Sequence, residues 1–102
     1  MEELPSTVQV GPFTYKIERD LNTDGDRAWG AIHHMTSTIG FAEACPSWRL
    51  PITFIHELIH AVESAYGFDL DENDTTRLAN GLAQGLQSAG FLPKELKLEG
   101  GK

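Results

Sequence analysis

Residues 51–67 read PITFIHELIHAVESAYG, and this stretch decides the fold. Pro51 suits the first turn of an α-helix, because the N–H that proline lacks would have no helical partner there. Gly67 is typical of the left-handed residue that closes a helix. Four apolar side chains recur at helical spacing and predict one buried stripe: Ile55, Ile59, Val62 and Tyr66. We therefore expect an amphipathic helix over residues 51–66.

The same helix carries an HExxH sequence, His56-Glu57-Leu58-Ile59-His60. Residues four apart lie on the same helical face, so both imidazoles can bind one metal ion at about 2.0–2.1 Å. Glu57 lies about 100° around the helix from His56, where its carboxylate can accept a proton from water beside the ion. Zinc suits these ligands, and peptide-bond hydrolysis is the reaction that such a site favours. The alternative is a pair of surface or core-rim histidines and a solvated glutamate.

A third ligand has to come from outside the HExxH sequence, and five acids follow it: Glu63, Asp69, Asp71, Glu72 and Asp74. Glu63 lies about 7 Å along the helix axis from the midpoint of the two histidines, so we expect it to orient a ligand or to be a solvated charge. Asp71 is explained as the N-cap of a second helix. Glu72 can reach across from the first turn of that helix. We predict Glu72 as the third ligand, the alternative being an acid that only stabilises the helix dipole.

Other polar side chains can contribute to the site, but each has a simpler explanation. His33 and His34 lie on a predicted strand, and one of them can line the cleft, although plain surface histidines are favoured. Cys45 can bind the metal as a thiolate in a latent form, but a buried loop cysteine is favoured. Three more residues are interpreted as core or polar packing: Tyr66, Asn80 and Gln84.

The rest of the chain predicts an α+β fold. Residues 7–20 predict a half-buried strand with a kink at Gly11-Pro12, and residues 29–34 and 36–41 predict a β-hairpin that pairs with it. A surface loop is expected at Asp24-Gly25. We expect a three-stranded antiparallel sheet packed on the HExxH helix and a second, C-terminal helix.

That second helix is expected between an N-cap at Asp71 and a stop at Gly90. Its predicted buried face consists of Thr75, Leu78, Ala79, Leu82, Leu86 and Ala89. After Phe91 and Leu92, which we expect to dock, residues 93–102 predict a mobile tail. Residues 1–102 are thus interpreted as a single minimal zincin-like domain with a core at about 7–92.

The composition argues against two classes of partner, nucleic acids and membranes. The 102 residues carry a formal net charge of −7 and contain one cysteine. Without a basic stripe, nucleic-acid binding is not expected. No apolar run approaches the roughly 18–20 residues that span a membrane, so no membrane is expected as a partner. The single cysteine and the lack of a leader sequence favour the cytoplasm.

The order of strand, Asp-Gly loop, hairpin, HExxH helix and final helix resembles the very small HExxH proteins encoded in phages and prophages. These are similar to minimal gluzincin-like peptidases and, more distantly, to ImmA/IrrE-type metallopeptidases. Four segments carry the resemblance, of which only the second is specific on its own: residues 8–15, 54–61, 70–72 and 77–82. The resemblance implies a zinc-dependent peptidase with His56 and His60 as ligands and Glu57 as base. Larger gluzincins have a glutamate in the helix after the motif, whereas residues 75–84 contain no acid.

Two functions are therefore predicted. The first is a zinc-dependent metallopeptidase that hydrolyses peptide bonds of an intracellular protein, with the substrate chain added to the edge of the strand over residues 29–34. The second is a non-catalytic binding, phage-assembly or regulatory protein that is stabilised by the metal. An open coordination position favours the peptidase, and a closed four-ligand site favours the binding protein.

Overall fold

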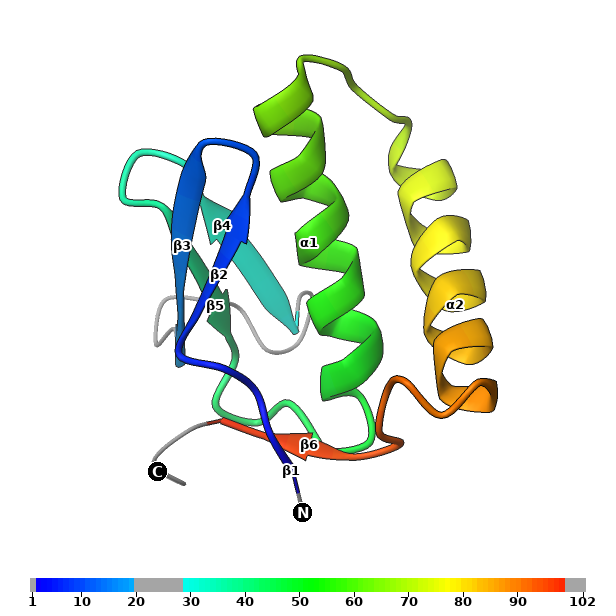
Figure 1. Ribbon diagram of the computed structural model, residues 1–102. Helices are drawn as coiled ribbons and strands as arrows, with labels where there is room; N and C mark the ends of the chain where they lie inside the picture. Colours follow the sequence, from blue (N-terminus) through cyan, green and yellow to red (C-terminus); the bar gives the residue numbers. More distant parts are fainter. Residues whose placement is uncertain (1, 20–28, 99–102) are drawn as a thin grey trace.

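The computed structural model describes residues 2–19 and 29–98, so the loop predicted at Asp24-Gly25 lies outside the described residues. Its helices and strands along the chain are β1 (Glu2–Glu3), β2 (Thr7–Val10), β3 (Phe13–Arg19), β4 (Gly30–His33), β5 (Thr38–Phe41), α1 (Leu50–Tyr66), α2 (Glu72–Ser88) and β6 (Leu96–Lys97). Figure 1 shows α1 between a twisted sheet on one side and α2 on the other. The predicted α+β class and both helices are confirmed.

The main sheet has four strands in the order β2-β3-β5-β4, and it is mixed, so the predicted three-stranded antiparallel sheet is wrong. Gly11 adopts a φ of 57°, and the turn there divides the expected first strand into β2 and β3, which pair antiparallel. The predicted hairpin of β4 and β5 is present. Its second strand, which is buried along its whole length, pairs with β3 in parallel. This arrangement leaves β4 at the edge of the sheet, beside α1.

Helix α1 starts and stops as its local sequence predicts. Pro51 lies in the first turn, and Gly67, with a φ of 74°, closes the helix. The predicted apolar stripe is only partly correct, because α1 packs on the sheet and on α2 and its apolar residues divide between two clusters. Ile55 is buried against α2, whereas Tyr66 is 67% exposed. Two acids of α1 are also buried, Glu57 and Glu63.

Helix α2 packs on α1 through small side chains rather than through its leucines. Asp71 caps the helix as predicted, since its Oδ1 accepts a hydrogen bond from the Asn73 N–H at 2.7 Å. The buried residues of α2 are Thr75, Ala79 and Ala83. Small side chains let the helices approach closely, so only a narrow strip of α2 is covered. Four residues predicted on the buried face are exposed instead: Leu78, Leu82, Leu86 and Ala89.

The two ends of the described chain form a second, two-stranded sheet in which β1 and β6 pair in parallel. Leu4 and Leu96 are 2% and 4% exposed and belong to the main core. The core therefore extends beyond the predicted residues 7–92, and residues 93–98 are not the frayed tail that was expected. Phe91, expected to dock, is exposed, whereas Leu92 packs against the core.

Neither helix of the described residues is long and apolar enough to cross a membrane.

Candidate metal centre

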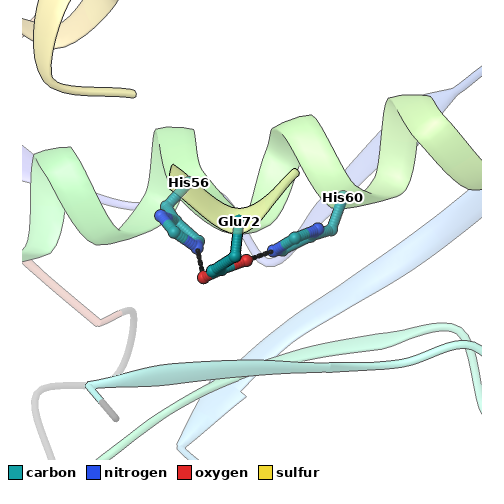
Figure 2. Close-up of side chains that lie close together, drawn as sticks. All are labelled: His56, His60 and Glu72. Carbon is teal, nitrogen blue, oxygen red and sulfur yellow. Dashed lines mark hydrogen bonds and ion pairs between the residues drawn. The ribbon is translucent and has the colours of Figure 1, made fainter. Parts of the chain in front are cut away.

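The three residues predicted as metal ligands lie together in the structure. His56 and His60 project from consecutive turns of α1, and Glu72, in the first turn of α2, reaches between them (Figure 2). Glu72 Oε2 lies 3.1 Å from His56 Nε2, and Glu72 Oε1 lies 3.3 Å from His60 Nε2. One ligand atom from each residue lies within 4.8 Å of the other two.

This donor set fits a zinc ion. Two imidazole nitrogens and one carboxylate oxygen form a common set of protein ligands in catalytic zinc sites. Zinc bonds of about 2.0–2.1 Å in a tetrahedron place neighbouring ligand atoms about 3.3 Å apart. The contacts of 3.1 and 3.3 Å use different oxygens of Glu72, and one ligand atom from each of the three residues lies within 4.8 Å of the other two. The three residues are therefore a group that could hold a metal ion.

Glu57 lies beside this ligand set and is not a member of it. Its side chain is buried between α1 and β4, close to Gly30. Burial raises the pKa of the Glu57 carboxyl to about 7, an effect to which Glu72 adds and which the charges of His60 and His33 oppose. A carboxyl with this pKa can both accept and return a proton near neutral pH.

Glu63, the alternative ligand, contacts His60 from the side that faces away from Glu72. Its Oε1 lies 2.7 Å from His60 Nδ1, and its Oε2 accepts a hydrogen bond from the Leu70 N–H. Burial alone would raise the pKa of Glu63, but these hydrogen bonds and the charges of His60 and His56 outweigh it and lower the pKa. Glu63 is therefore an ionised neighbour of a ligand, as its position on the helix predicts.

One hollow borders all three predicted ligands, and a second borders His60 alone among them. One, of about 410 Å³, is lined by Glu57 and the ligand set together with residues that the sequence did not single out: Trp29, Gly30, Ile32, Arg49, Ile52, Thr53 and Thr76. The other, of about 620 Å³, shares Ile32 and His60 with the first and extends to Phe68 and Asp69. Because Ile32 belongs to β4, the edge strand borders both hollows. No spacing in the sequence signals these neighbours, since the fold alone brings β4 to α1.

Other candidates have structural roles. The hydroxyl of Tyr15 lies 3.2 Å from His34 Nδ1, and His34 lines the larger hollow. Cys45 lies away from the ligand set, on a hollow that Leu50 and Leu96 also line, and burial raises the pKa of its thiol. The favoured interpretation as a partly buried loop cysteine agrees with this position. Of the residues interpreted as packing, Asn80 lines the smaller hollow, whereas Tyr66 and Gln84 are exposed.

The acids next to Glu72 offer a direct test of the third ligand. Glu72→Ala is expected to weaken zinc binding by more than about 100-fold, because the loss of an orienting neighbour alone costs about 10- to 100-fold. Asp71→Ala removes a helix cap and should lower stability by about 1 kcal/mol with little change in zinc affinity. Competition with a chromophoric chelator measures both affinities. Equal losses in the two variants would assign the third ligand to another residue.

Gly30 allows β4 to approach the Glu57 carboxylate. A Cβ atom at Gly30 would lie 2.7 Å from Thr53 Cγ2 and 3.3 Å from Glu57 Oε2. Thr53 cannot easily turn away, because its hydroxyl donates a hydrogen bond to the Arg49 carbonyl at 2.9 Å. We expect Gly30→Ala to destabilise the protein by about 1–3 kcal/mol, as overpacking does.

The matched control for this variant is Gly81→Ala on α2, where an added Cβ has no neighbour within 4 Å. It should stabilise the protein by about 0.5–1 kcal/mol, because alanine is the better helix former. Urea denaturation measures both changes in the free energy of unfolding. A Gly30→Ala variant as stable as the wild type would show that β4 and α1 are not packed this closely.

No family model, curated protein or solved structure matches the chain. The resemblance to phage-encoded HExxH proteins therefore stays a prediction, and the function has to be argued from the site itself.

Proposed function

We propose that this protein is a zinc-dependent metallopeptidase. The observation that carries the proposal is the position of Glu72, whose carboxylate approaches both histidines of the HExxH helix from a different helix. A chance HExxH pattern gives no reason for an acid to meet both imidazoles. Together the three residues supply the ligands that a catalytic zinc site requires, and they leave a fourth position for water or substrate.

Each residue has a distinct role in this proposal. His56, His60 and Glu72 would hold the ion, which when bound would lower the pKa of its water to about 7 and polarise a carbonyl group. Glu57 accepts the proton that the attacking water loses and returns it to the amine that leaves. Its carboxyl is buried between α1 and β4 and lines the same hollow as the ligand set, which suits it to this role.

The surroundings of the site suit an extended peptide. β4 is at the edge of the sheet, so it can pair with a substrate backbone without a deep pocket. The two hollows beside this strand, which share Ile32 and His60, offer space for substrate side chains. We therefore propose proteins or peptides as the substrates.

A second candidate function is a non-catalytic binding protein in which the metal only stabilises the fold. Leu78 and Leu82 of α2 favour it, because they line an apolar hollow of about 570 Å³ on the side of α2 that α1 does not cover. Exposed apolar surface of this kind is typical of protein interaction sites. Here the chain would still bind zinc, but it would cleave no peptide.

One experiment separates the two functions. The protein is stripped of metal with a chelator and dialysed, and it is then incubated with a mixed peptide library with and without one equivalent of zinc. The peptidase proposal predicts new peptide termini, detected by mass spectrometry, only when zinc is present. Zinc binding with thermal stabilisation but without cleavage would favour the binding protein. Failure to bind zinc would contradict both.

A further inference from the structure

We propose that Glu63 is a positioning residue that fixes both halves of the metal site. It orients the ring of His60 and holds the linker that carries Glu72 toward the histidines. This inference rests on the proposed zinc site, but the contacts on which it depends exist without the metal.

The first line of support is the linker between the helices, residues 67–71. Gly67 N–H and Phe68 N–H both donate to the backbone carbonyl of Glu63, at 2.9 and 3.1 Å. Leu70 N–H donates to the Glu63 side chain. Three N–H groups of a five-residue linker thus bond to one residue of α1. Since Glu72 follows this linker directly, its position relative to α1 depends on Glu63.

The second line of support is the other oxygen of the same carboxylate. Glu63 Oε1 lies 2.7 Å from His60 Nδ1. The other oxygen of this carboxylate accepts from the Leu70 N–H, and a carboxylate oxygen only accepts, so we infer that Nδ1 is the donor in this contact. The other ring nitrogen, Nε2, is the atom 3.3 Å from Glu72 Oε1, and in the neutral ring it is the one with a free lone pair for the metal.

Burial distinguishes this pairing from a surface ion pair. The Glu63 side chain is 8% exposed, whereas that of Glu72 is 68% exposed. Charge-assisted hydrogen bonds are stronger than neutral ones, and a buried carboxylate needs partners for both oxygens. Glu63 has a partner for each oxygen: one is His60 itself, and the other is Leu70, which lies two residues before Glu72. A carboxylate behind a ligating histidine fixes its ring orientation and tautomer.

The substitution Glu63→Gln tests the effect of Glu63 on the His60 ring separately from its effect on the linker. The Gln oxygen can still accept from Leu70, so the linker should keep its position. The Gln amide, however, donates to His60 Nδ1, which moves the ring proton to Nε2 and opposes metal binding there. We expect zinc affinity about 10- to 100-fold weaker than wild type, still at one ion per chain.

Asp69→Asn is the matched control for charge. It removes one negative charge from the same linker without touching His60, and its zinc affinity should remain within about twofold of wild type. A chelator competition at one pH compares the three proteins. Equal affinity for wild type and Glu63→Gln, or equal losses in both variants, would overturn the proposal.

Nuclear magnetic resonance of the metal-free protein decides the point even if the chain binds no zinc. At a pH where His60 is neutral, its nitrogen shifts should report a proton on Nδ1 in the wild type and on Nε2 in Glu63→Gln. The Leu70 amide should exchange slowly in both, and roughly tenfold or more faster in Glu63→Ala, which removes a hydrogen bond to a charged group. An unchanged His60 tautomer, or unchanged Leu70 exchange in Glu63→Ala, would overturn the positioning role. If these two results are as expected but the wild type binds no zinc, only the proposed function is contradicted.

Discussion

Glu57→Gln is expected to lower the rate of peptide hydrolysis by about 10²- to 10⁴-fold while one zinc ion per chain is retained, because general-base catalysis contributes about this factor. Glutamine has nearly the shape of glutamate, so it should fill the space between α1 and β4, but its amide cannot accept a proton from water. Glu57 is outside the ligand set, so metal affinity should change little. Peptide cleavage and elemental analysis on the same preparation measure the two quantities.

The control for this variant is Glu95→Gln, which changes an exposed glutamate on another part of the surface. It should leave both activity and zinc content unchanged. Wild-type activity in Glu57→Gln would show that another group accepts the proton. Loss of zinc together with activity would show that the carboxylate is needed to build the site, and the assigned role of Glu57 would then be wrong.

The double variant His56→Ala, His60→Ala is expected to lose zinc completely, because one carboxylate in an exposed position is a poor ligand set. At a free zinc concentration of about 1,000 times Kd, binding to the native state stabilises a protein by about 4 kcal/mol. For a domain of this size, that corresponds to a rise in Tm of roughly 15–30 °C. The wild type should show this rise on addition of zinc, and the double variant should not.

Elemental analysis of both proteins after gel filtration provides the second readout. We expect about one zinc per wild-type chain and none in the variant. Zinc retained by the double variant, or an equal rise in Tm for both proteins, would place the metal elsewhere in the chain. Circular dichroism of the metal-free proteins shows whether the variant is folded, so that a lost site is not confused with a lost fold.

Local signals in the sequence predict the helices well, and they select three residues that lie together in the structure. Pro51, Gly67 and Asp71 act on the backbone within a few residues, so their effects can be recognised without the rest of the fold. The step of four from His56 to His60 depends only on the geometry of one helix. For Glu72, the length of its side chain and its place in the first turn of α2 were sufficient.

Long-range features could not be predicted in this way. The alternating residues of β3 indicate a strand, but they do not say that its partner is β5 in parallel rather than β4. The leucines of α2 show helical spacing, yet the smaller Ala79 and Ala83 are buried because they permit a closer approach to α1. The contact of Gly30 with Glu57 depends on two segments that meet only in the folded chain.

The pairing of β1 with β6 has a consequence for the order of folding. Glu2 pairs with Leu96, so this contact closes almost the largest loop that the described chain allows, and such contacts form slowly. The proposed metal ligands, by contrast, lie within residues 56–72, a helical hairpin of low contact order. We expect the amides of α1 to become protected before that of Leu4, which donates to the Lys97 carbonyl at 2.8 Å. Pulse-labelled hydrogen exchange during refolding tests this order, and simultaneous protection of both would contradict it. During synthesis on a ribosome, residues 56–72 could then fold before β6, whose Lys97 carbonyl accepts from Leu4, has been synthesised.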